Sequence, residues 1–380
     1  MCTTRPASKD AISLARAAAL SFAVQQRNMR SSPPPGLVEG WLEQGWVLLL
    51  GDSLTRHVFL ELYTTLCSNG NTEQAQSTTH ADYHNARTFC MYERHGACEY
   101  VVSPRRTQQG AANATAEFQP RCPQQMVNYA FGRTKPPQLC VTFDWAPLWE
   151  DVLAELKLVK SACGEAPSSL VTNPGLHELL DAHLHVASAR DMMRVRRDVG
   201  WRLKSIISEL ARGRGGTLTT LVVQSATSVE SSQFPTRKIH ERGLLNNRRI
   251  ELYNAAVDLV TRRQTAYAAS LGVCLTRTDG FALTTRNRDV LNGTIDGIHW
   301  RPPFDRLMLD ADLEHLDCRL DWHKKAERHS LKHEATRASR PRRGANSGRA
   351  WRNARRSGGR AAQQPLEASQ ASDVLDDPYF

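Results

Sequence analysis

Short runs of apolar and β-branched residues recur along this chain, and each run is followed by a turn signal. Runs of this length between turn residues are typical of strands that are buried on both faces, so we predict a strand at each of them. The runs are WVLLL (46–50), LCVTF (139–143), SLVTN (169–173), TLTTLVVQS (217–225) and GVCLTRT (272–278).

Longer segments between these runs place apolar residues three and four positions apart, which predicts helices. The clearest of them cover residues 54–66, 179–212 and 246–272. Strands that alternate with helices form a parallel sheet covered on both faces, so we predict an α/β fold. In such sheets the reactive groups lie at the carboxyl ends of the strands.

The two ends of the chain differ from its middle. The Pro-rich break SSPPPG separates an N-terminal segment, 1–36, from a domain that we place at 37–320. The formal net charge of +10 is concentrated in residues 321–360, which hold 13 Lys and Arg against 3 Asp and Glu, and the last 20 residues are acidic. We predict that residues 331–380 form a disordered, solvated tail, with binding of RNA or an acidic surface as the alternative.

The chain has nine cysteines, and five of them lie between residues 67 and 140. This clustering is typical of a loop-rich insertion held by disulfides, with scattered buried thiols as the alternative. Sequons at Asn113 and Asn292 also favour the secretory pathway, in the Golgi lumen or outside the cell, over the cytoplasm. The apolar run 17–24 has the outline of a signal sequence, but an ordinary helix fits it better, and no run reaches the roughly 18 apolar residues that span a bilayer.

The first predicted strand ends at VLLLGDSLTRH (47–57), where an amphipathic pattern begins directly after Gly-Asp-Ser. Ser53 is therefore expected at the carboxyl end of a strand and the amino end of a helix, where free N–H groups can hold a developing oxyanion. A tight turn at this junction requires Gly51, because glycine tolerates unusual backbone angles. Ser53 is either a nucleophile or an ordinary N-cap of the helix.

A serine hydroxyl needs a base to act as a nucleophile, and the base needs a carboxylate to orient it. Asp296 and His299 follow the last predicted strand, and their separation of three residues lets the carboxylate fold back onto the imidazole ring. Asn173 and Gly175 follow the run SLVT, where a side-chain amide can contact an oxyanion. Each pair is also compatible with a plain turn, but their joint position at strand ends favours a reactive site.

Three segments of the chain resemble the motifs of a known family: GDSLTRHVF (51–59), VTNPGLHEL (171–179) and FALTTRNRDVLNGTIDGIHW (281–300), which ends in Asp-x-x-His. Over residues 37–320 the chain resembles the SGNH or GDSL hydrolase superfamily and, within it, the PC-esterase group. That group includes the trichome birefringence-like proteins and the catalytic domains of sialic-acid O-acetyltransferases.

The resemblance implies a three-layer α/β/α sandwich with a parallel sheet of flavodoxin-like topology, and a Ser–His–Asp triad. It implies Ser53 as the nucleophile, His299 as the general base and Asp296 as the residue that orients the base. Gly132 is the candidate for the superfamily's second-block glycine. The residues implied at the oxyanion or the substrate are Asp52, Arg56, Asn173 and Gly175.

The sequence therefore predicts a serine enzyme that acts on O-acylated, above all O-acetylated, glycans or related cell-surface polymers through an acyl-Ser53 intermediate. Water as the acceptor would make it an esterase, and a sugar hydroxyl would make it an O-acyltransferase; the acyl donor stays open. The alternatives are a catalytically inactive SGNH-like binding protein and a protein that binds RNA or an acidic surface through its basic tail. We expect no cofactor and no other contact with nucleic acid.

Two further groups of residues bear on binding. Trp145, Trp149 and Trp300 are candidates for stacking against sugar rings, with core packing as the alternative for at least one of them. The segment HELLDAHLH (177–185) gathers His177, Asp181, His183 and His185 but lacks the H-E-x-x-H spacing, so we predict no metal site there.

Overall fold

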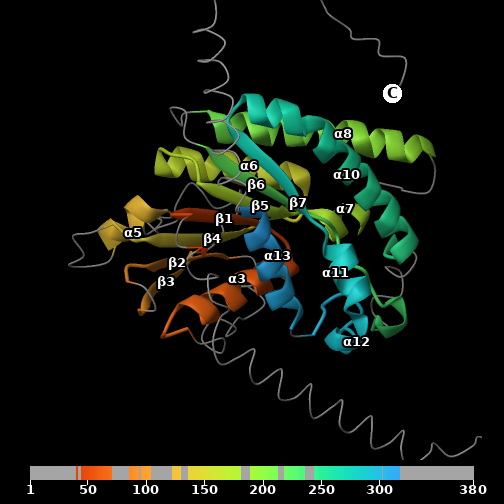
Figure 1. Cartoon of the computed structure of the whole chain (residues 1–380), viewed down its shortest axis with the longest axis horizontal. Coiled ribbons are helices and arrows are strands. Elements are labelled where there is room, and N and C mark those ends of the chain that lie inside the picture. The colour runs from red at the N-terminus through yellow and green to blue at the C-terminus, as the bar shows by residue number, and fades with distance from the viewer. Residues whose placement is uncertain are drawn as a thin grey trace, which may run out of the picture. The chain divides into compact units, whose positions relative to one another are not determined.

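A computed structural model of the chain describes residues 40–41, 44–70, 85–93, 96–103, 122–129, 136–180, 189–212, 218–235, 244–301 and 303–316 (Figure 1). All of these residues belong to the first of the two units into which the chain divides, Met1–Asp321 and Trp322–Phe380. The predictions for the N-terminal segment, for the tail, for Asn113 and for Gly132 lie outside the described residues and stay predictions.

A seven-stranded sheet forms the centre of the first unit, with the strand order β3-β2-β4-β1-β5-β6-β7. The five strands from β4 to β7 in this order are parallel, and in chain order they have the 2-1-3-4-5 arrangement of a flavodoxin-like sheet. The strands are β1 (Trp46–Gly51), β2 (Ala86–Met91), β3 (Cys98–Ser103), β4 (Leu139–Trp145), β5 (Ser169–Asn173), β6 (Thr219–Gln224) and β7 (Val273–Thr278).

The five predicted strands, the α/β class and their parallel sheet are confirmed, and the sheet carries two further strands, β2 and β3, as an antiparallel edge. β2 pairs with both β3 and β4 in antiparallel orientation. The apolar pattern does not predict β2 and β3, because ARTFCM and CEYVVS are interrupted by Arg, Cys and Glu. Both strands lie in the Cys-rich segment that we interpreted as a loop-rich insertion.

Helices cover both faces of the sheet, so the predicted three-layer sandwich is confirmed (Figure 1). α3 and α13 pack together on one face, whereas α6, α8 and α10 lie on the other. Among the helices in the described part of the chain, none has both the length and the apolar character needed to cross a bilayer. The helices are α3 (Ser53–Leu66), α5 (Pro123–Tyr129), α6 (Trp149–Cys163), α7 (Gly175–Leu180), α8 (Ala189–Ala211), the 3₁₀ helix η2 (Ser231–Gln233), α10 (Asn247–Ser270), α11 (Gly280–Arg286), α12 (Arg288–Leu291) and α13 (Phe304–Leu316).

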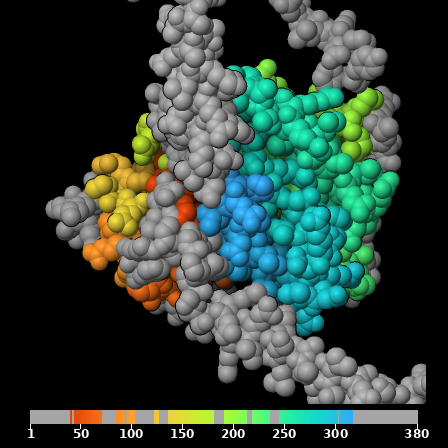
Figure 2. Space-filling view, viewed as in Figure 1, coloured from red at the N-terminus to blue at the C-terminus, as the bar shows by residue number. Residues whose placement is uncertain are grey.

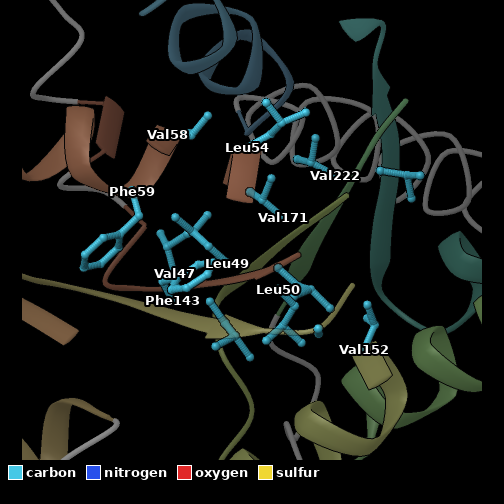
Figure 3. Close-up of a cluster of buried hydrophobic side chains, with 14 of the residues drawn as sticks. Val47, Leu49, Leu50, Leu54, Val58, Phe59, Phe143, Val152, Val171 and Val222 are labelled. Carbon is cyan, nitrogen blue, oxygen red and sulfur yellow. The ribbon is translucent and has the colours of Figure 1, made fainter. Parts of the chain in front are cut away.

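The hydrophobic core lies on both faces of β1, and all six residues of that strand are buried. Successive side chains of a strand point to opposite faces. Leu49 points to the face covered by α3, the side on which Leu54 and Val58 lie, and Leu50 points to the opposite face near Val152 of α6 (Figure 3). Because both faces are covered, the strand is a continuous apolar run instead of an alternating one.

Two disulfides, Cys67–Cys98 and Cys90–Cys140, join the antiparallel edge to the rest of the unit, and a third, Cys122–Cys163, lies outside that edge. They link the end of α3 to β3, β2 to β4, and the residue before α5 to the end of α6. Cys274 in β7 is also disulfide-bonded. The predicted disulfides are confirmed, but they extend beyond the predicted limit of the insertion at residue 140.

A buried carboxyl group connects α13 to the sheet. Asp312 is fully buried and accepts hydrogen bonds from Thr278 Oγ1 at 2.7 Å and from Gln224 Nε2 at 2.5 Å. Burial raises the pKa of Asp312 to about 7, because the two hydrogen bonds offset only part of the lost hydration. In the unfolded chain the pKa of an Asp is about 3.9. The group therefore stabilises the fold fully below about pH 4, and this contribution is lost as the pH rises through 7.

Replacing Asp312 with Asn removes this titration while keeping the shape of the protonated side chain. We expect the melting temperature of Asp312→Asn, relative to wild type, to rise between pH 5 and pH 8 by about 2–4 °C for each kcal/mol recovered. Thermal unfolding at both pH values measures the difference, and Asp289→Asn, an exposed acid on α12, is the control. A difference that stays constant or falls with pH would contradict the role of Asp312.

Candidate active site

Polar side chains from three segments meet at the carboxyl edge of the sheet. Ser53 follows β1, Asn173 ends β5, and the loop 293–301 follows α12. Parallel strands have their carboxyl ends at the same edge, which is why groups so far apart in sequence can share one site.

Ser53 is the first residue of α3 and lies directly after β1 with only Asp52 between them. Asp52 is the N-cap of the helix, and its Oδ1 accepts a hydrogen bond from the backbone N–H of Leu54 at 2.9 Å. Burial raises the pKa of Asp52, and charges on His177 and His299 oppose this rise. The first N–H groups of a helix have no partner inside it. Those of Leu54 and Thr55 bond Asp52, which leaves the N–H of Ser53 beside its own hydroxyl as a donor.

Gly51 is required at this junction for a reason other than the one that we predicted. Its φ angle is not positive, so the expected unusual backbone conformation is wrong. A Cβ atom on Gly51 would lie 2.1 Å from Oγ1 of Thr55, one turn into α3. The glycine therefore lets the helix start against the end of β1, which holds Ser53 at the edge of the sheet.

The hydroxyl of Ser53 meets the imidazole of His299. Ser53 Oγ lies 2.7 Å from His299 Nε2, and His299 Nδ1 lies 3.0 Å from each carboxylate oxygen of Asp296. Burial would raise the pKa of Asp296, but hydrogen bonds from the ring and the backbone of His299 hold that pKa well below its usual range. An ionised Asp296 orients the ring and leaves Nε2 free to accept the proton of Ser53, so the arrangement can generate a serine nucleophile.

The loop that carries Asp296 and His299 is held by its own backbone. Asp296 Oδ1 accepts hydrogen bonds from the N–H groups of Ile298 and His299, at 3.1 and 2.9 Å. Gly297 between them has a φ of +89°, a conformation that favours glycine. The short Asp-x-x-His spacing thus works because the chain turns at Gly297 and brings the carboxylate back to the ring.

A second carboxylate, Glu230, fastens this loop to the segment after β6. Glu230 accepts hydrogen bonds from the backbone N–H of Thr294 at 2.9 Å and from Arg288 Nη2 at 2.8 Å. Trp300 Nε1 donates to the backbone carbonyl of Ser228 at 2.8 Å. Sequence reasoning missed this pair, because Glu230 lies in none of the quoted motifs and is 58 residues from Arg288.

Asn173 and Gly175 lie at the end of β5, where they were predicted. The backbone N–H of Gly175 donates to Asn173 Oδ1 at 3.4 Å, and within the described residues Nδ2 of Asn173 has no hydrogen-bond partner. A Cβ on Gly175 would lie 2.6 Å from the Cβ of Ala226, so the glycine allows a close approach to the end of β6. The side chain of Asn254 holds the backbone of Ala226: its Oδ1 accepts from the N–H of Ala226, and its Nδ2 donates to the carbonyl of Ala226.

Arg56 is buried in α3, with 7% of its surface exposed. Burial lowers the pKa of His57 and raises that of Tyr100; the charge of Arg56 adds to the first effect and opposes the second, so the guanidinium lies near both side chains. Contact between Arg56 and a substrate stays a prediction.

The three tryptophans proposed for sugar stacking belong to the core. Trp149 is 1% exposed and donates from Nε1 to the hydroxyl of Tyr253, and Trp300 is 2% exposed. Trp145 is 6% exposed, and its ring meets that of His177 edge-on. The prediction that sugars stack on Trp149 or Trp300 is therefore wrong, because neither ring presents a face to solvent.

The structure describes only residues 177–180 of the histidine-rich segment 177–185. Within the described part of the chain, no three His, Cys, Asp or Glu side chains are grouped closely enough to hold a metal ion.

The chain is similar to several solved structures, which include the following two. One is the crystal structure of the lipase/acylhydrolase from Enterococcus faecalis, with 13% identity and a TM-score of 0.36, covering 72% of this chain and 96% of that one. The other is LAE5, an alpha/beta hydrolase enzyme from the metagenome of Lake Arreo, Spain, with 12% identity and a TM-score of 0.35, covering 72% and 95%. No protein-family model and no curated protein matches the chain.

Gly297 gives a test of how firmly the loop positions His299. A Cβ at this residue would lie 2.0 Å from Phe234 and 2.9 Å from the carbonyl oxygen of Glu230, so Gly297→Ala must displace the loop. We expect its reaction rate with a fluorophosphonate, which labels activated serines, to fall about a hundredfold, because small misplacements of reacting groups cost about that much.

The matched control for this experiment is Gly272→Ala. Gly272 also has a positive φ, +73°, but its Cβ would meet no atom within 4 Å. We expect this variant to lose some stability and to label at close to the wild-type rate. Equal labelling of the two variants would show that the loop does not position the base.

Proposed function

We propose that the protein is a serine acyl-ester enzyme, in which Ser53 is the nucleophile, His299 the general base and Asp296 the residue that orients it. The observation that carries this proposal is the continuous contact from Ser53 Oγ through the His299 ring to both oxygens of Asp296. The same three groups in this order generate a serine nucleophile on several unrelated folds.

The first half of the reaction transfers the acyl group to Ser53. Oγ attacks the carbonyl carbon while His299 Nε2 accepts its proton, and the carbonyl oxygen becomes an oxyanion. The backbone N–H of Ser53, at the start of α3, and Nδ2 of Asn173 are the proposed donors to this oxyanion. Collapse of the tetrahedral intermediate breaks the ester bond, and the leaving alcohol takes the proton from His299.

The second half of the reaction returns the enzyme to its starting state. His299 takes a proton from the acceptor, whose oxygen attacks the acyl carbon, and Ser53 Oγ leaves with that proton. Water as the acceptor gives an esterase, and a hydroxyl group of a glycan gives an O-acyltransferase. The same residues serve both outcomes, so the choice depends on which acceptor reaches the acyl group.

The proposed substrates are O-acylated, above all O-acetylated, glycans or related polymers of the cell surface. Support comes from the GDSLTRHVF and Asp-x-x-His segments, which resemble PC-esterases. The three disulfides are typical of the secretory pathway, where such polymers occur. Of the alternatives, an inactive binding protein would not need a serine hydroxyl in contact with an oriented imidazole. Binding of RNA through the tail stays a separate prediction.

Labelling with a fluorophosphonate probe tests the nucleophile directly. Wild type should label, Ser53→Ala should not, and His299→Gln should lose nearly all labelling because the serine lacks its base. Asp296→Asn should slow the reaction by about 10⁴-fold, since the ring loses its orientation and correct tautomer. Ser205→Ala, which removes a serine hydroxyl that bonds only its own helix, is the control. Undiminished labelling of Ser53→Ala would exclude the proposed nucleophile.

Asn173→Asp tests the proposed oxyanion donor. The substitution keeps an oxygen that can accept from the N–H of Gly175 and removes the amide donors. We expect kcat for an acetate ester to fall about 10²–10³-fold with little change in KM, because the donor acts mainly on the transition state. A fall confined to KM would instead place Asn173 in substrate binding.

A further inference from the structure

A second imidazole lies against the ring of His299. His57 is on α3, one helical turn after Ser53, so both side chains are on the same face of the helix. The ring centroids of His57 and His299 are 5.6 Å apart, and the ring planes are inclined by only 19°. Sequence reasoning missed His57, although its spacing of four residues from the nucleophile was a usable signal.

A carboxyl group, that of Asp305, lies close to the ring of His57. Its Nδ1 lies 4.0 Å from Oδ2 of Asp305, in the first turn of α13. Arg306 next to it donates to Thr65 of α3 at 3.3 Å, which holds the two helices together. Figure 1 shows α3 and α13 side by side, and Figure 2 shows α13 reaching the surface of the unit. The pair of Asp305 and His57 therefore stands beside the pair of Asp296 and His299.

The other ring nitrogen of His57 is available to a ligand. The side chain is 31% exposed, and within the described residues Nε2 has no hydrogen-bond partner. Oδ1 of Asp305 is buried without a hydrogen-bond partner among the described residues, and Oδ2 of the same carboxyl group lies near Nδ1 of His57. A ring that stacks on His299 and has an open nitrogen is suited to binding a polar group of a substrate.

His57 is neutral at neutral pH. Burial is the largest cause that lowers its pKa to about 4; the charges of His299 and Arg56 act in the same direction, and Asp296 opposes them. Burial and the charge of Glu61 raise the pKa of Asp305 to about 7. A neutral imidazole has one N–H donor and one acceptor nitrogen, which matches the donor and acceptor capacity of a hydroxyl group. It also places no second positive charge beside His299 when that ring takes up a proton.

We propose that His57 binds the alcohol part of the substrate, with Nε2 hydrogen-bonded to a free hydroxyl of a polyhydroxy compound such as a sugar, and that Asp305 positions its ring. This inference rests on the proposed function, because it concerns the alcohol whose ester Ser53 attacks. The bound hydroxyl is a second one on the same molecule, distinct from the esterified oxygen that His299 serves. His57 thus selects polyol esters over esters whose alcohol has no further hydroxyl.

The test compares two acetate esters in wild type and His57→Phe. Phenylalanine keeps an aromatic ring against His299 but has no nitrogen. The first ester is a monoacetylated methyl glucoside, which has free hydroxyls, and the second is 4-nitrophenyl acetate, which has none. We expect kcat/KM for the sugar ester to fall about three- to tenfold, mainly through KM, because one hydrogen bond to the bound substrate is lost. The fall for 4-nitrophenyl acetate should be clearly smaller.

The control variant is His315→Phe, which changes a half-buried histidine at the other end of α13 whose Nδ1 contacts Thr276. It should leave the ratio of the two kcat/KM values unchanged. An equal fall for both esters with His57→Phe would mean that His57 only supports the ring of His299, and this result would overturn the proposal. No change for either ester would also overturn it.

Asp305→Asn is the second variant and covers the case in which His57→Phe does not fold. It keeps the size of the side chain and removes the carboxyl group beside Nδ1. We expect the same preferential rise in KM for the sugar ester, by about two- to threefold. Failure of the proposed function would appear separately, as a wild type that is not labelled at Ser53. A wild type that labels and hydrolyses 4-nitrophenyl acetate but leaves the sugar ester intact would overturn the polyol assignment alone.

Discussion

The contact between Ser53 and His299 is the constraint on which the rest of the site depends. The two residues are 246 positions apart, yet their side chains lie 2.7 Å apart. A serine hydroxyl without a base at this distance is a weak nucleophile. The parallel sheet makes the contact possible, because the carboxyl ends of all its parallel strands lie at the same edge. What remains is to hold each partner in place, and the structure does this in two different ways.

Ser53 is positioned by local structure. The buried strand β1, the close approach at Gly51 and the Asp52 cap together determine where α3 begins. His299 is positioned by a loop whose turn at Gly297 brings Asp296 back to the ring, and Glu230 binds that loop to the neighbouring strand end. The position of Ser53 therefore depends on the core of the sheet, whereas that of His299 depends on a polar network.

This difference explains what the sequence could predict. Ser53 directly follows an apolar run that marks a strand, and Asp296 and His299 form the short Asp-x-x-His segment, so the parallel strands and these three residues could be predicted from the sequence. The helices α11 and α12, which separate that segment from β7, could not. Glu230 and Asp305 could not be predicted in this way, because the residues that they contact, Thr294 and His57, are distant from them in sequence. The antiparallel edge was missed for a similar reason, since disulfides such as Cys90–Cys140 stabilise strands that the apolar pattern does not mark.

The central claim is that the acyl group passes through a covalent bond to Ser53. Mass spectrometry of the full chain, quenched with acid during turnover of 4-nitrophenyl acetate, tests this claim most directly. The account predicts an acetylated protein whose modification maps to the peptide that contains Ser53, and no such adduct in Ser53→Ala. Turnover by wild type without an acetylated Ser53, or acetylation at another residue that persists in Ser53→Ala, would contradict it.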